Sequence, residues 1–344
     1  MSKTLRVATV GAGYFSQFHY DAWARIEDVK LVALCNRNAT AASEVAQKYN
    51  VESVFTDFEK MLDEIKPDLV DIITPPETHS AYVLAALKRN IPCICQKPFT
   101  PSFEEATALV NTIKEKNGKV IIHENFRFQP WYQEIKKLLD SQSLGKIYNV
   151  TFKLRPGDGQ GEDAYLSRQP YFRDMERFLI HETGIHWVDV FRYLLGEVES
   201  VYADLQQLNH VIKGEDAGIV LFQFTNDIRA IFDGNRLADH SAENLRLTMG
   251  EMQIEGSTAS LALNGDGKIN IRKHGEVNWV PHEYSFTTKS FGGDCVYNLQ
   301  KHVVNHILYN TELHNPVESY IKNLSVENLI YQSAESKTQK KLVK

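Results

Sequence analysis

The sequence predicts an α/β domain with a parallel sheet, followed by an α+β domain with a large, mainly antiparallel open sheet. Over the first 125 residues, short apolar runs alternate with helical stretches, which is typical of a parallel sheet with helices on both faces. From about residue 147, apolar runs follow one another with only short turns between them, which favours antiparallel strands. We therefore predict two domains, 1–126 and 127–344.

In the first domain the pattern accounts for five strands and four helices. The predicted strands are residues 5–11, 29–36, 68–74, 91–96 and 119–125. The predicted helices are residues 15–25, 39–49, 78–88 and 103–116. Pro67, Pro92 and the pair Asn117–Gly118 fall between elements, where residues that break regular structure are expected.

In the second domain the pattern accounts for seven strands and one helix. The predicted strands are residues 147–155, 198–207, 217–225, 228–236, 246–256, 257–263 and 268–273. Residues 225–227 and 264–267 carry the Asn, Asp and Gly that tight hairpin turns require. The predicted helix covers residues 175–195 and interrupts the run of strands.

Composition and charge exclude several classes of protein. Apolar residues make up 43% of the 344 residues and charged residues 24%, as in globular proteins. The net charge of −6 argues against nucleic acid as a partner, because such binding needs a cationic surface. No apolar run reaches the roughly 20 residues of a membrane span. We therefore expect no membrane partner. Four cysteines are too few for a disulfide framework, so we also expect a reduced, cytoplasmic protein.

A glycine-rich turn follows the first strand. Gly11 and Gly13 precede Tyr14 and Phe15, which open the first helix. Two glycines at this point allow a tight turn and a close approach of the backbone to a pyrophosphate, and the helix N-terminus favours its negative charge. An ordinary turn would not need both glycines. The first domain is therefore predicted to be a Rossmann dinucleotide-binding domain.

The end of the second strand lacks the acid that commonly binds the adenosine ribose. Asn36 and Arg37 stand there instead. Asn36 can hydrogen-bond a ribose hydroxyl, and Arg37 can stack on adenine, pair with a 2′-phosphate or simply be solvated. The sequence thus leaves both NAD and NADP open as cofactors.

Two further segments follow predicted strands, at the sheet edge where ligands collect in open α/β folds. One contains Thr74, Pro75 and His79, and the other contains Gln96 and Lys97. We predict that these five residues also line the cofactor site, although a lysine before a proline is often just a solvated loop residue.

In the second domain, residues 181–189 hold the densest group of side chains that could act in catalysis or bind a metal. His181 and His186 are five residues apart, which places them about 140° apart around a helix and excludes a shared zinc ion. No metal is therefore expected. Glu182 and His186 are four residues apart and would stack on one helix face. Such a pair can serve as a general acid and base, or it can be an ordinary surface pair.

Taken together, these segments resemble the Gfo/Idh/MocA oxidoreductase family. The matching stretches are GAGYFSQFH (11–19), DIITPPETH (71–79), ICQKPF (94–99), HENFRFQP (123–130), ETGIHWVD (182–189) and EGSTASLAL (255–263). The resemblance implies that Lys97 is the active-site lysine and that His186 is the catalytic acid and base. It places Glu182 where the family usually has an aspartate that helps to hold the sugar.

This chain departs from the family pattern at Gln96, where a glutamate is usual. A glutamine lacks the negative charge and so favours the charged form of Lys97 less than a glutamate would. The resemblance also adds Asn125 and Arg127 of the HENFRF stretch to the predicted substrate residues.

Narrower stretches resemble the D-apiose dehydrogenase branch of the family. They are QKPFTPS (96–102), HENFRFQPWY (123–132) and RPGDGQGEDAYLSRQPYFR (155–173). The last stretch is a polar loop that could bind sugar hydroxyls through Arg155, Asp158, Gln160 and Arg168. It could equally be a loop shared by several sugar dehydrogenases or one used at a subunit interface.

The function that these observations predict is an NAD(P)-dependent dehydrogenase that oxidises a sugar or polyol by hydride transfer, with D-apiose to its lactone as one candidate. Two alternatives are a non-catalytic NAD(P)-sensing regulatory protein and a nicotinamide-dependent glycosidase. The resemblance further implies a homodimer or homotetramer that associates through the open sheet face.

Overall fold

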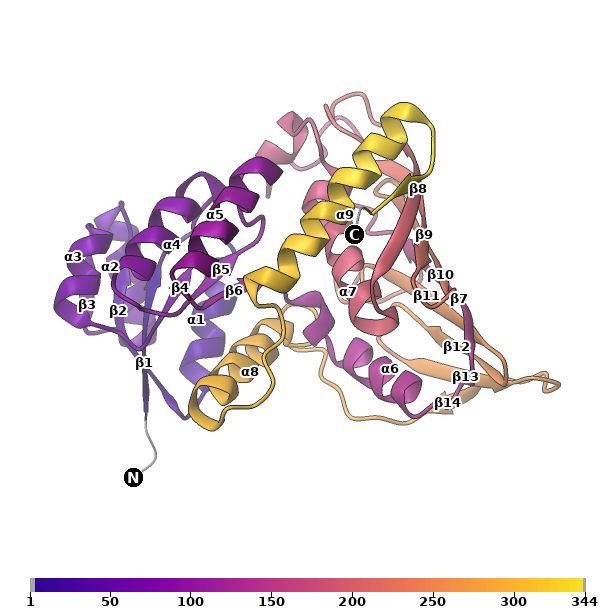
Figure 1. Ribbon diagram of the computed structural model, residues 1–344, viewed down its shortest axis with the longest axis horizontal. Helices are drawn as coiled ribbons and strands as arrows, with labels where there is room; N and C mark the ends of the chain where they lie inside the picture. The colour runs from indigo at the N-terminus through magenta and orange to yellow at the C-terminus, as the bar shows by residue number, and fades with distance from the viewer. Residues whose placement is uncertain (1–3, 343–344) are drawn as a thin grey trace. The chain divides into compact units, whose positions relative to one another are not determined.

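The computed structural model describes residues 4–342, which form two compact units (Figure 1). One unit comprises the chain up to Asn125 together with Val296–Lys322, and the other comprises Phe126–Cys295 together with the chain from Asn323 onward. We call them unit 1 and unit 2. Across the described residues, no helix is both long enough and apolar enough to cross a membrane.

Unit 1 is built on a parallel sheet with the strand order β3-β2-β1-β4-β5-β6, as the sequence predicts. Its strands are β1 (Leu5–Val10), β2 (Val29–Cys35), β3 (Ser53–Phe55), β4 (Leu69–Ile72), β5 (Cys93–Gln96) and β6 (Val120–His123). The helices between them are α1 (Ser16–Arg25), α2 (Ala39–Tyr49), α3 (Phe58–Ile65), α4 (His79–Lys88) and α5 (Phe103–Glu115). Every residue of β4 is buried, because helices cover both faces of the sheet.

Local capping explains where several of these helices begin. Asn38 accepts hydrogen bonds from the first turn of α2, and Ser102 does the same for α5. Asp57 caps α3 in this way. The sequence pattern nevertheless missed both α3 and β3. Strand β3 was missed because it has only three residues, at the edge of the sheet, which are too few to show a hydrophobic period.

A segment from the C-terminal half of the chain packs into unit 1. Helix α8 (Cys295–Tyr309) lies beside α1 (Figure 1), where the Arg25 guanidinium lies 4.6 Å from the centre of the Tyr297 ring. Asn315 then accepts a backbone hydrogen bond from Ile122 of β6. The predicted domain boundary near residue 126 coincides with the point at which the chain passes from unit 1 to unit 2. Residues 296–322, which we assigned to the second domain, belong instead to unit 1, where these contacts hold them.

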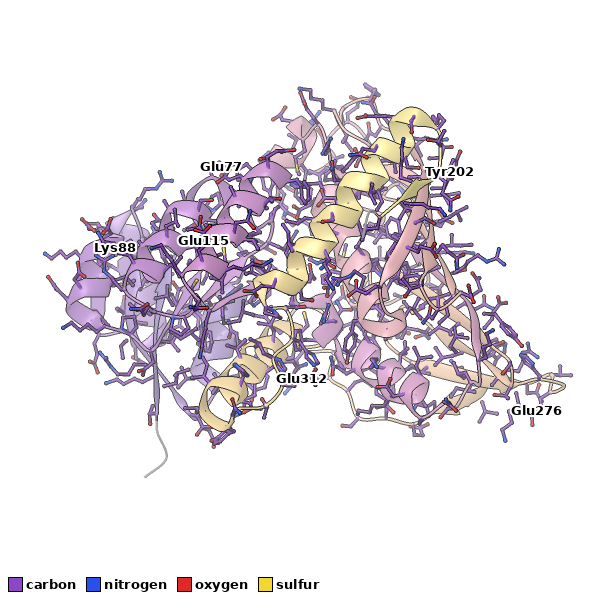
Figure 2. All side chains as sticks on the ribbon, in the orientation of Figure 1. Glu77, Lys88, Glu115, Tyr202, Glu276 and Glu312 are labelled. Atoms are coloured by element: carbon purple, nitrogen blue, oxygen red, sulfur yellow. The ribbon has the colours of Figure 1, made fainter. Side chains whose placement is uncertain are left out.

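Unit 2 is built on a mixed, mostly antiparallel sheet. Its nine strands, counted among the described residues, have the order β14-β13-β12-β11-β7-β10-β9-β8-β15, and β7 and β10 are the parallel pair. The strands are β7 (Ile147–Leu154), β8 (Val198–Gln206), β9 (Ala217–Phe224), β10 (Arg229–Asn235), β11 (Gly250–Gly256), β12 (Ala259–Leu263), β13 (Ile269–Lys273), β14 (Val280–His282) and β15 (Lys340–Lys341). Glu276 marks the turn between β13 and β14 (Figure 2).

Helices cover one face of this sheet (Figure 1). They are α6 (Pro130–Asp140), α7 (Ile185–Leu195) and the part of α9 (Val317–Ser336) that belongs to unit 2. The Trp187 ring of α7 stacks on Phe152 of β7 at 4.2 Å. Burial alternates along β11, which confirms that one face of the sheet is packed and the other is open.

The predicted helix at 175–195 is wrong in its first half. Residues Leu179–Gly184 form a short π-helix, and the α-helix begins at Ile185. Tertiary contacts stabilise this wider turn, since the Glu215 carboxylate accepts the Ile180 N–H and the Arg236 guanidinium donates to the Thr183 hydroxyl. Glu182 and His186 therefore do not lie on one regular α-helix, and the spacing argument for their stacking does not apply.

A buried ion pair connects Asp189, within α7, to Arg127, which precedes α6 in the chain. Arg127 donates two hydrogen bonds, of 2.7 and 2.6 Å, to the Asp189 carboxylate. Asn323 of α9 donates a third at 2.7 Å. Asp189 is 1% exposed, so the pair holds three segments of unit 2 together.

Replacing Asp189 with Ala should destabilise the protein by about 3–5 kcal/mol, because it leaves the Arg127 charge buried without its carboxylate. Chemical denaturation followed by circular dichroism measures this loss. The matched control is Asp63→Ala, which removes an exposed carboxylate from its pair with Arg89 and should leave the unfolding midpoint nearly unchanged. Equal midpoints for the two variants would contradict the role of the buried pair.

Candidate functional site

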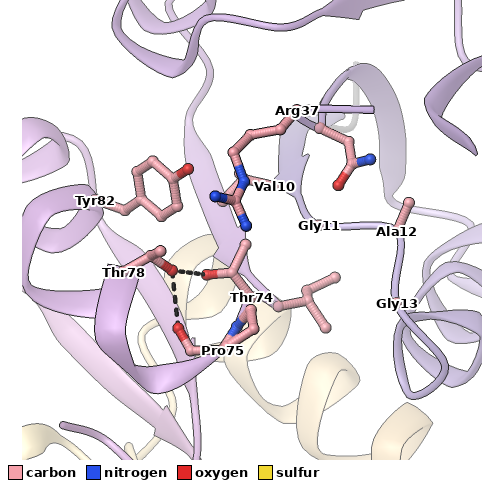
Figure 3. A pocket seen from close by; sticks show the side chains of 11 residues that line it. Val10, Gly11, Ala12, Gly13, Arg37, Thr74, Pro75, Thr78 and Tyr82 are labelled. Atoms are coloured by element: carbon pink, nitrogen blue, oxygen red, sulfur yellow. Dashed lines mark hydrogen bonds between the residues drawn. The ribbon is translucent and has the colours of Figure 1, made fainter. Parts of the chain in front are cut away.

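A cavity of about 230 Å³ lies at the carboxyl ends of β1, β2 and β4 in unit 1. Its lining comes from the glycine turn, the end of β2 and the start of α4 (Figure 3). The lining residues are Val10, Gly11, Ala12, Gly13, Asn36, Arg37, Ile73, Thr74, Pro75, Thr78 and Tyr82. Three predicted groups of cofactor residues therefore meet at one cavity.

The two glycines of the turn have different reasons to be glycine. Gly11 has φ = +115°, and a Cβ there would lie 2.7 Å from the Ile73 carbonyl oxygen, so the fold itself excludes a side chain. Gly13 is exposed, and a Cβ there would meet nothing within 4 Å. Because Gly13 lines the cavity, this open space leaves room for a pyrophosphate to approach the backbone. The turn fits a dinucleotide.

At the end of β2, Arg37 points into the cavity toward the side lined by Tyr82 and Thr74 (Figure 3). Asn36 donates a hydrogen bond of 3.0 Å from its amide to the Asn38 carbonyl. Burial raises the pKa of the Tyr82 phenol, which keeps it a neutral hydrogen-bonding group. The adenosine end of a dinucleotide would thus meet a guanidinium, a phenol and two amide or hydroxyl groups.

The other predicted cofactor residues of unit 1 have more varied surroundings. Thr78 donates from its hydroxyl to the Thr74 hydroxyl at 2.7 Å (Figure 3). The His79 side chain is instead buried between the carbonyls of Thr74 and Phe99, at 2.7 and 3.1 Å. Burial lowers the pKa of His79, and a neutral imidazole carries one N–H, so it can donate to only one of these two carbonyls. The structure places His79 behind the lining of the cavity.

Gln96 is the last residue of β5 and Lys97 follows it, and both are half-buried. The Gln96 side chain folds back so that its Oε1 accepts the Lys97 backbone N–H at 2.7 Å. Lys97 thus leaves the strand at the carboxyl edge of the sheet, in a fixed direction. Asn125, also of unit 1, is 3% exposed, and its amide nitrogen has no acceptor among the described residues.

In unit 2, His186 lies in the first turn of α7 and is 6% exposed. Its ring stacks on Phe126 with centroids 3.8 Å apart and planes 3° apart. This parallel stack fixes the plane of the imidazole. Arg127, a predicted substrate residue, is held by Asp189 as described above.

Glu182 lies in the π-helix, half-buried. Tyr171 is 56% exposed; the partial burial of its phenol, and then the Glu182 carboxylate, raise the pKa of that phenol to about 12. Tyr171 also accepts a hydrogen bond of 3.2 Å from Gln169. The carboxylate of Glu182 and the neutral phenol of Tyr171 are both groups that can bind hydroxyl groups.

The loop 155–173 is ordered around its own partners. Its residues Ala164, Tyr165 and Phe172 pack with Phe178 and Ile212 in a small apolar cluster. Asp158 accepts hydrogen bonds from Tyr165, Arg168 and Arg236, at 2.9, 3.2 and 2.8 Å.

Two further predicted substrate residues of this loop also contact protein groups. Gln160 donates to the Leu237 carbonyl. Arg155 pairs with Asp233 at 2.7 Å. Of the four predicted substrate residues in this loop, Asp158 and Arg168 contact each other, whereas Arg155 and Gln160 contact Asp233 and Leu237.

Sequence reasoning missed Arg236, whose guanidinium donates hydrogen bonds to Asp158 and Tyr165 of this loop. It is 2% exposed and lies directly after β10. Burial opposes its charge, and the Asp158 carboxylate and the Tyr165 hydroxyl together outweigh this effect, so the pKa of Arg236 lies above its ordinary value. An arginine straight after an apolar strand was the available signal. Tyr82 was also missed, although it stands one helical turn after Thr78.

Comparison with protein families gives two matches that together cover most of the chain. The family described as "Oxidoreductase family, NAD-binding Rossmann fold" matches residues 5–124. The "GFO/IDH/MocA C-terminal domain" matches residues 132–262. The first match covers the glycine turn, the cavity and Lys97, and the second covers Glu182 and His186.

Among individual proteins, the chain is 30% identical over 267 residues to a D-apiose dehydrogenase of Rhizobium rhizogenes, covering 78% of this chain and 75% of that protein. It is 29% identical over 271 residues to a D-apiose dehydrogenase of Paraburkholderia graminis, covering 78% and 70%. A solved oxidoreductase of Agrobacterium radiobacter, in complex with NAD⁺, L-tartaric acid and magnesium, superposes with a TM-score of 0.87 at 26% identity and 98% coverage of both chains.

Replacing Gly13 with Val should weaken NAD binding at least about tenfold, equivalent to roughly 1.4 kcal/mol, because the branched side chain would fill the space near the turn. The melting temperature should stay close to that of the wild type, since nothing in the protein occupies that space. Calorimetric titration and thermal melting measure the two effects. The contrasting variant Gly11→Ala should lower the melting temperature instead. Unchanged NAD affinity in Gly13→Val would place the pyrophosphate elsewhere.

Proposed function

The chain belongs to the Gfo/Idh/MocA family of oxidoreductases, and on that premise we propose that it is an NAD(P)-dependent dehydrogenase of a small neutral sugar. The observation that carries the proposal is the meeting of the glycine turn, Arg37 and Thr74 at one cavity on the carboxyl edge of a parallel sheet. Ligands of open α/β sheets bind at this edge.

Two relatives named as D-apiose dehydrogenases support an aldose as the substrate. On this basis we propose D-apiose, oxidised at its anomeric carbon to the lactone, as the first substrate to test. The proposed substrate residues, all named from the sequence, are Asn125, Glu182, Lys97 and His186.

The charges of the loop 155–173 and its surroundings favour a neutral sugar over a sugar phosphate. Arg168 and Arg236 both pair with Asp158, and Arg155 pairs with Asp233. A phosphate site would need guanidinium groups that are available to the phosphate oxygens. These three arginines are neutralised by carboxylates within the protein.

In the proposed reaction, the His186 imidazole takes the proton of the substrate hydroxyl while hydride leaves the same carbon. The bound nicotinamide cofactor supplies the acceptor for that hydride. Lys97 donates a hydrogen bond to the reacting oxygen and stabilises the negative charge that develops there. The stack on Phe126 keeps the plane of the His186 ring constant during the proton transfer.

We further propose a cytoplasmic homodimer or homotetramer. The four cysteines are free and buried, which suits a reducing compartment. Tyr202, Ile219 and Leu221 lie exposed on the open face of the nine-stranded sheet, with Tyr202 labelled in Figure 2. An apolar group of this kind suits contact with a second copy.

The purified protein should oxidise D-apiose with a higher kcat/KM than xylose, glucose, galactose or myo-inositol. Reduced cofactor is read by absorbance, with NAD and NADP in separate assays. A hexose or polyol that is better by about tenfold, or 1.4 kcal/mol, would replace apiose as the substrate. A better phosphorylated sugar would contradict the charge argument. Cleavage of a glycoside without net reduction of the cofactor would instead indicate the glycosidase alternative.

Lys97→Ala should reduce kcat more than tenfold, and His186→Asn should reduce kcat and remove the rise of rate with pH. An imidazole that accepts the proton works in its neutral form, so the wild-type rate increases as histidine loses its proton, near pH 6.5 for an ordinary histidine. Steady-state kinetics from about pH 5 to 9 measures both effects.

A Lys97→Ala variant with a kcat loss below about tenfold would imply that Lys97 stabilises the transition state by less than roughly 1.4 kcal/mol. That result would contradict the proposed role of Lys97 at the reacting oxygen.

Arg37→Ala should weaken NADP binding more than NAD binding, because the guanidinium is the group in the cavity that can pair with a 2′-phosphate. The wild type should bind both cofactors with less than about hundredfold preference, or roughly 2.7 kcal/mol. Fluorescence titration with each reduced cofactor measures the two affinities. Equal losses would mean that Arg37 stacks on adenine, and no loss would mean that it is solvated.

A further inference from the structure

A chain of polar side chains leads from the centre of the parallel sheet in unit 1 to Lys97. Asp71 of β4 is fully buried, and its Oδ2 lies 2.8 Å from Nδ1 of His19. The other ring nitrogen of His19, Nε2, lies 3.4 Å from Nε2 of Gln96. Gln96 Oε1 in turn accepts the Lys97 backbone N–H at 2.7 Å.

Hydrogen-bond polarity allows one assignment for this chain. Because Gln96 uses its oxygen to accept from Lys97, its NH₂ group must face His19, and an NH₂ group only donates. His19 Nε2 must then be the acceptor and carry no proton. The His19 proton is therefore on Nδ1, from which it is donated to the Asp71 carboxylate.

Beyond Lys97, the chain passes close to His79, whose Nδ1 lies 3.1 Å from the Phe99 carbonyl oxygen. The Nε2 of the same ring lies closer to the Thr74 carbonyl oxygen, at 2.7 Å, and a neutral imidazole has one N–H to donate. The hydrogen bond that holds the Lys97 backbone is therefore the one to Gln96.

We propose that Gln96 is a positioning residue for Lys97, and that it holds Lys97 only while His19 is neutral with its proton on Nδ1. A second proton on His19 would set an N–H of the ring against the NH₂ group of Gln96. The amide would then have to turn its oxygen toward His19 and release the Lys97 N–H. This inference rests on the proposed function in one respect, which is that Lys97 acts on the substrate.

Several groups face His19 and influence its charge. Asp71 favours a second proton, and Trp23 and Gln300 also donate to the same Asp71 oxygen, at 2.7 and 3.4 Å. The His123 ring of β6 lies 4.1 Å from the His19 ring and would repel its charge when itself protonated. Phe15 packs against the His19 ring with centroids 5.7 Å apart. Gln96 is the neighbour whose donor group directly opposes a proton on Nε2.

The Gln96→Glu variant tests this polarity because it replaces the donor with an acceptor. A glutamate can accept from Lys97 with one oxygen and from a protonated His19 Nε2 with the other. We expect ¹⁵N-edited NMR of the ring nitrogens near neutral pH to show wild-type His19 neutral with the proton on Nδ1. The same measurement should show His19 doubly protonated in Gln96→Glu.

The Gln96→Met variant tests the positioning itself, since it keeps the length of the side chain and removes both hydrogen bonds. We expect kcat to fall at least about tenfold while KM for the sugar changes much less, because a reacting group is displaced and sugar binding is retained. The matched control is Gln300→Met, which removes a donor to Asp71 but leaves the contacts of Gln96 in place. It should keep the wild-type His19 tautomer and most of kcat.

Wild-type His19 found doubly protonated, or with its proton on Nε2, would overturn the inference. An unchanged kcat in Gln96→Met would overturn it as well. If the protein oxidised no sugar at all, the proposed function would fail, but the NMR assignment of His19 in the wild type and in Gln96→Glu would still decide the polarity of the chain. The two failures are therefore distinguishable.

Discussion

The packing of unit 1 depends on a carboxylate that is buried in the middle of its parallel sheet. Asp71 has no exposed surface, and a buried carboxylate is tolerated only when nearby donors satisfy it. One of its oxygens, Oδ2, has donors in His19 and Trp23 of α1 and in Gln300 of α8, while Oδ1 has no donor among the described residues. The positions of two helices, one of them from the C-terminal half of the chain, are thus constrained by one polar group in addition to apolar contacts.

The same requirement organises unit 2. Arg236 is buried among aromatic rings and needs the Asp158 carboxylate, the Tyr165 hydroxyl and the Thr183 hydroxyl as acceptors. These bonds join the loop 155–173 to the π-helix that carries Glu182. Both segments are therefore held by one guanidinium, which fixes Asp158 and Tyr165 of the loop relative to Thr183 of the π-helix.

Patterns that act over a few residues were readable from the sequence. The alternation of strands and helices predicted the parallel sheet and the antiparallel one, and the spacing of Gly11 and Gly13 predicted the turn that lines the cavity. Each of these signals depends on backbone conformation or on burial along a single element. Short or irregular elements were missed: β3 is too short to show a period, and the π-helix at 179–184 has the same local residue pattern as an α-helix.

By itself, the sequence determined the two domain classes, the cofactor turn and the family to which the chain belongs. The tertiary structure alone decided which charged partners the polar residues have. Arg127, Arg155 and Asp158 were predicted to be substrate residues, and each is paired with a carboxylate or guanidinium 62 to 78 residues away. A buried charge takes the partner that the fold brings near it, and that partner is set by the packing of sheets and helices, which local spacing does not encode.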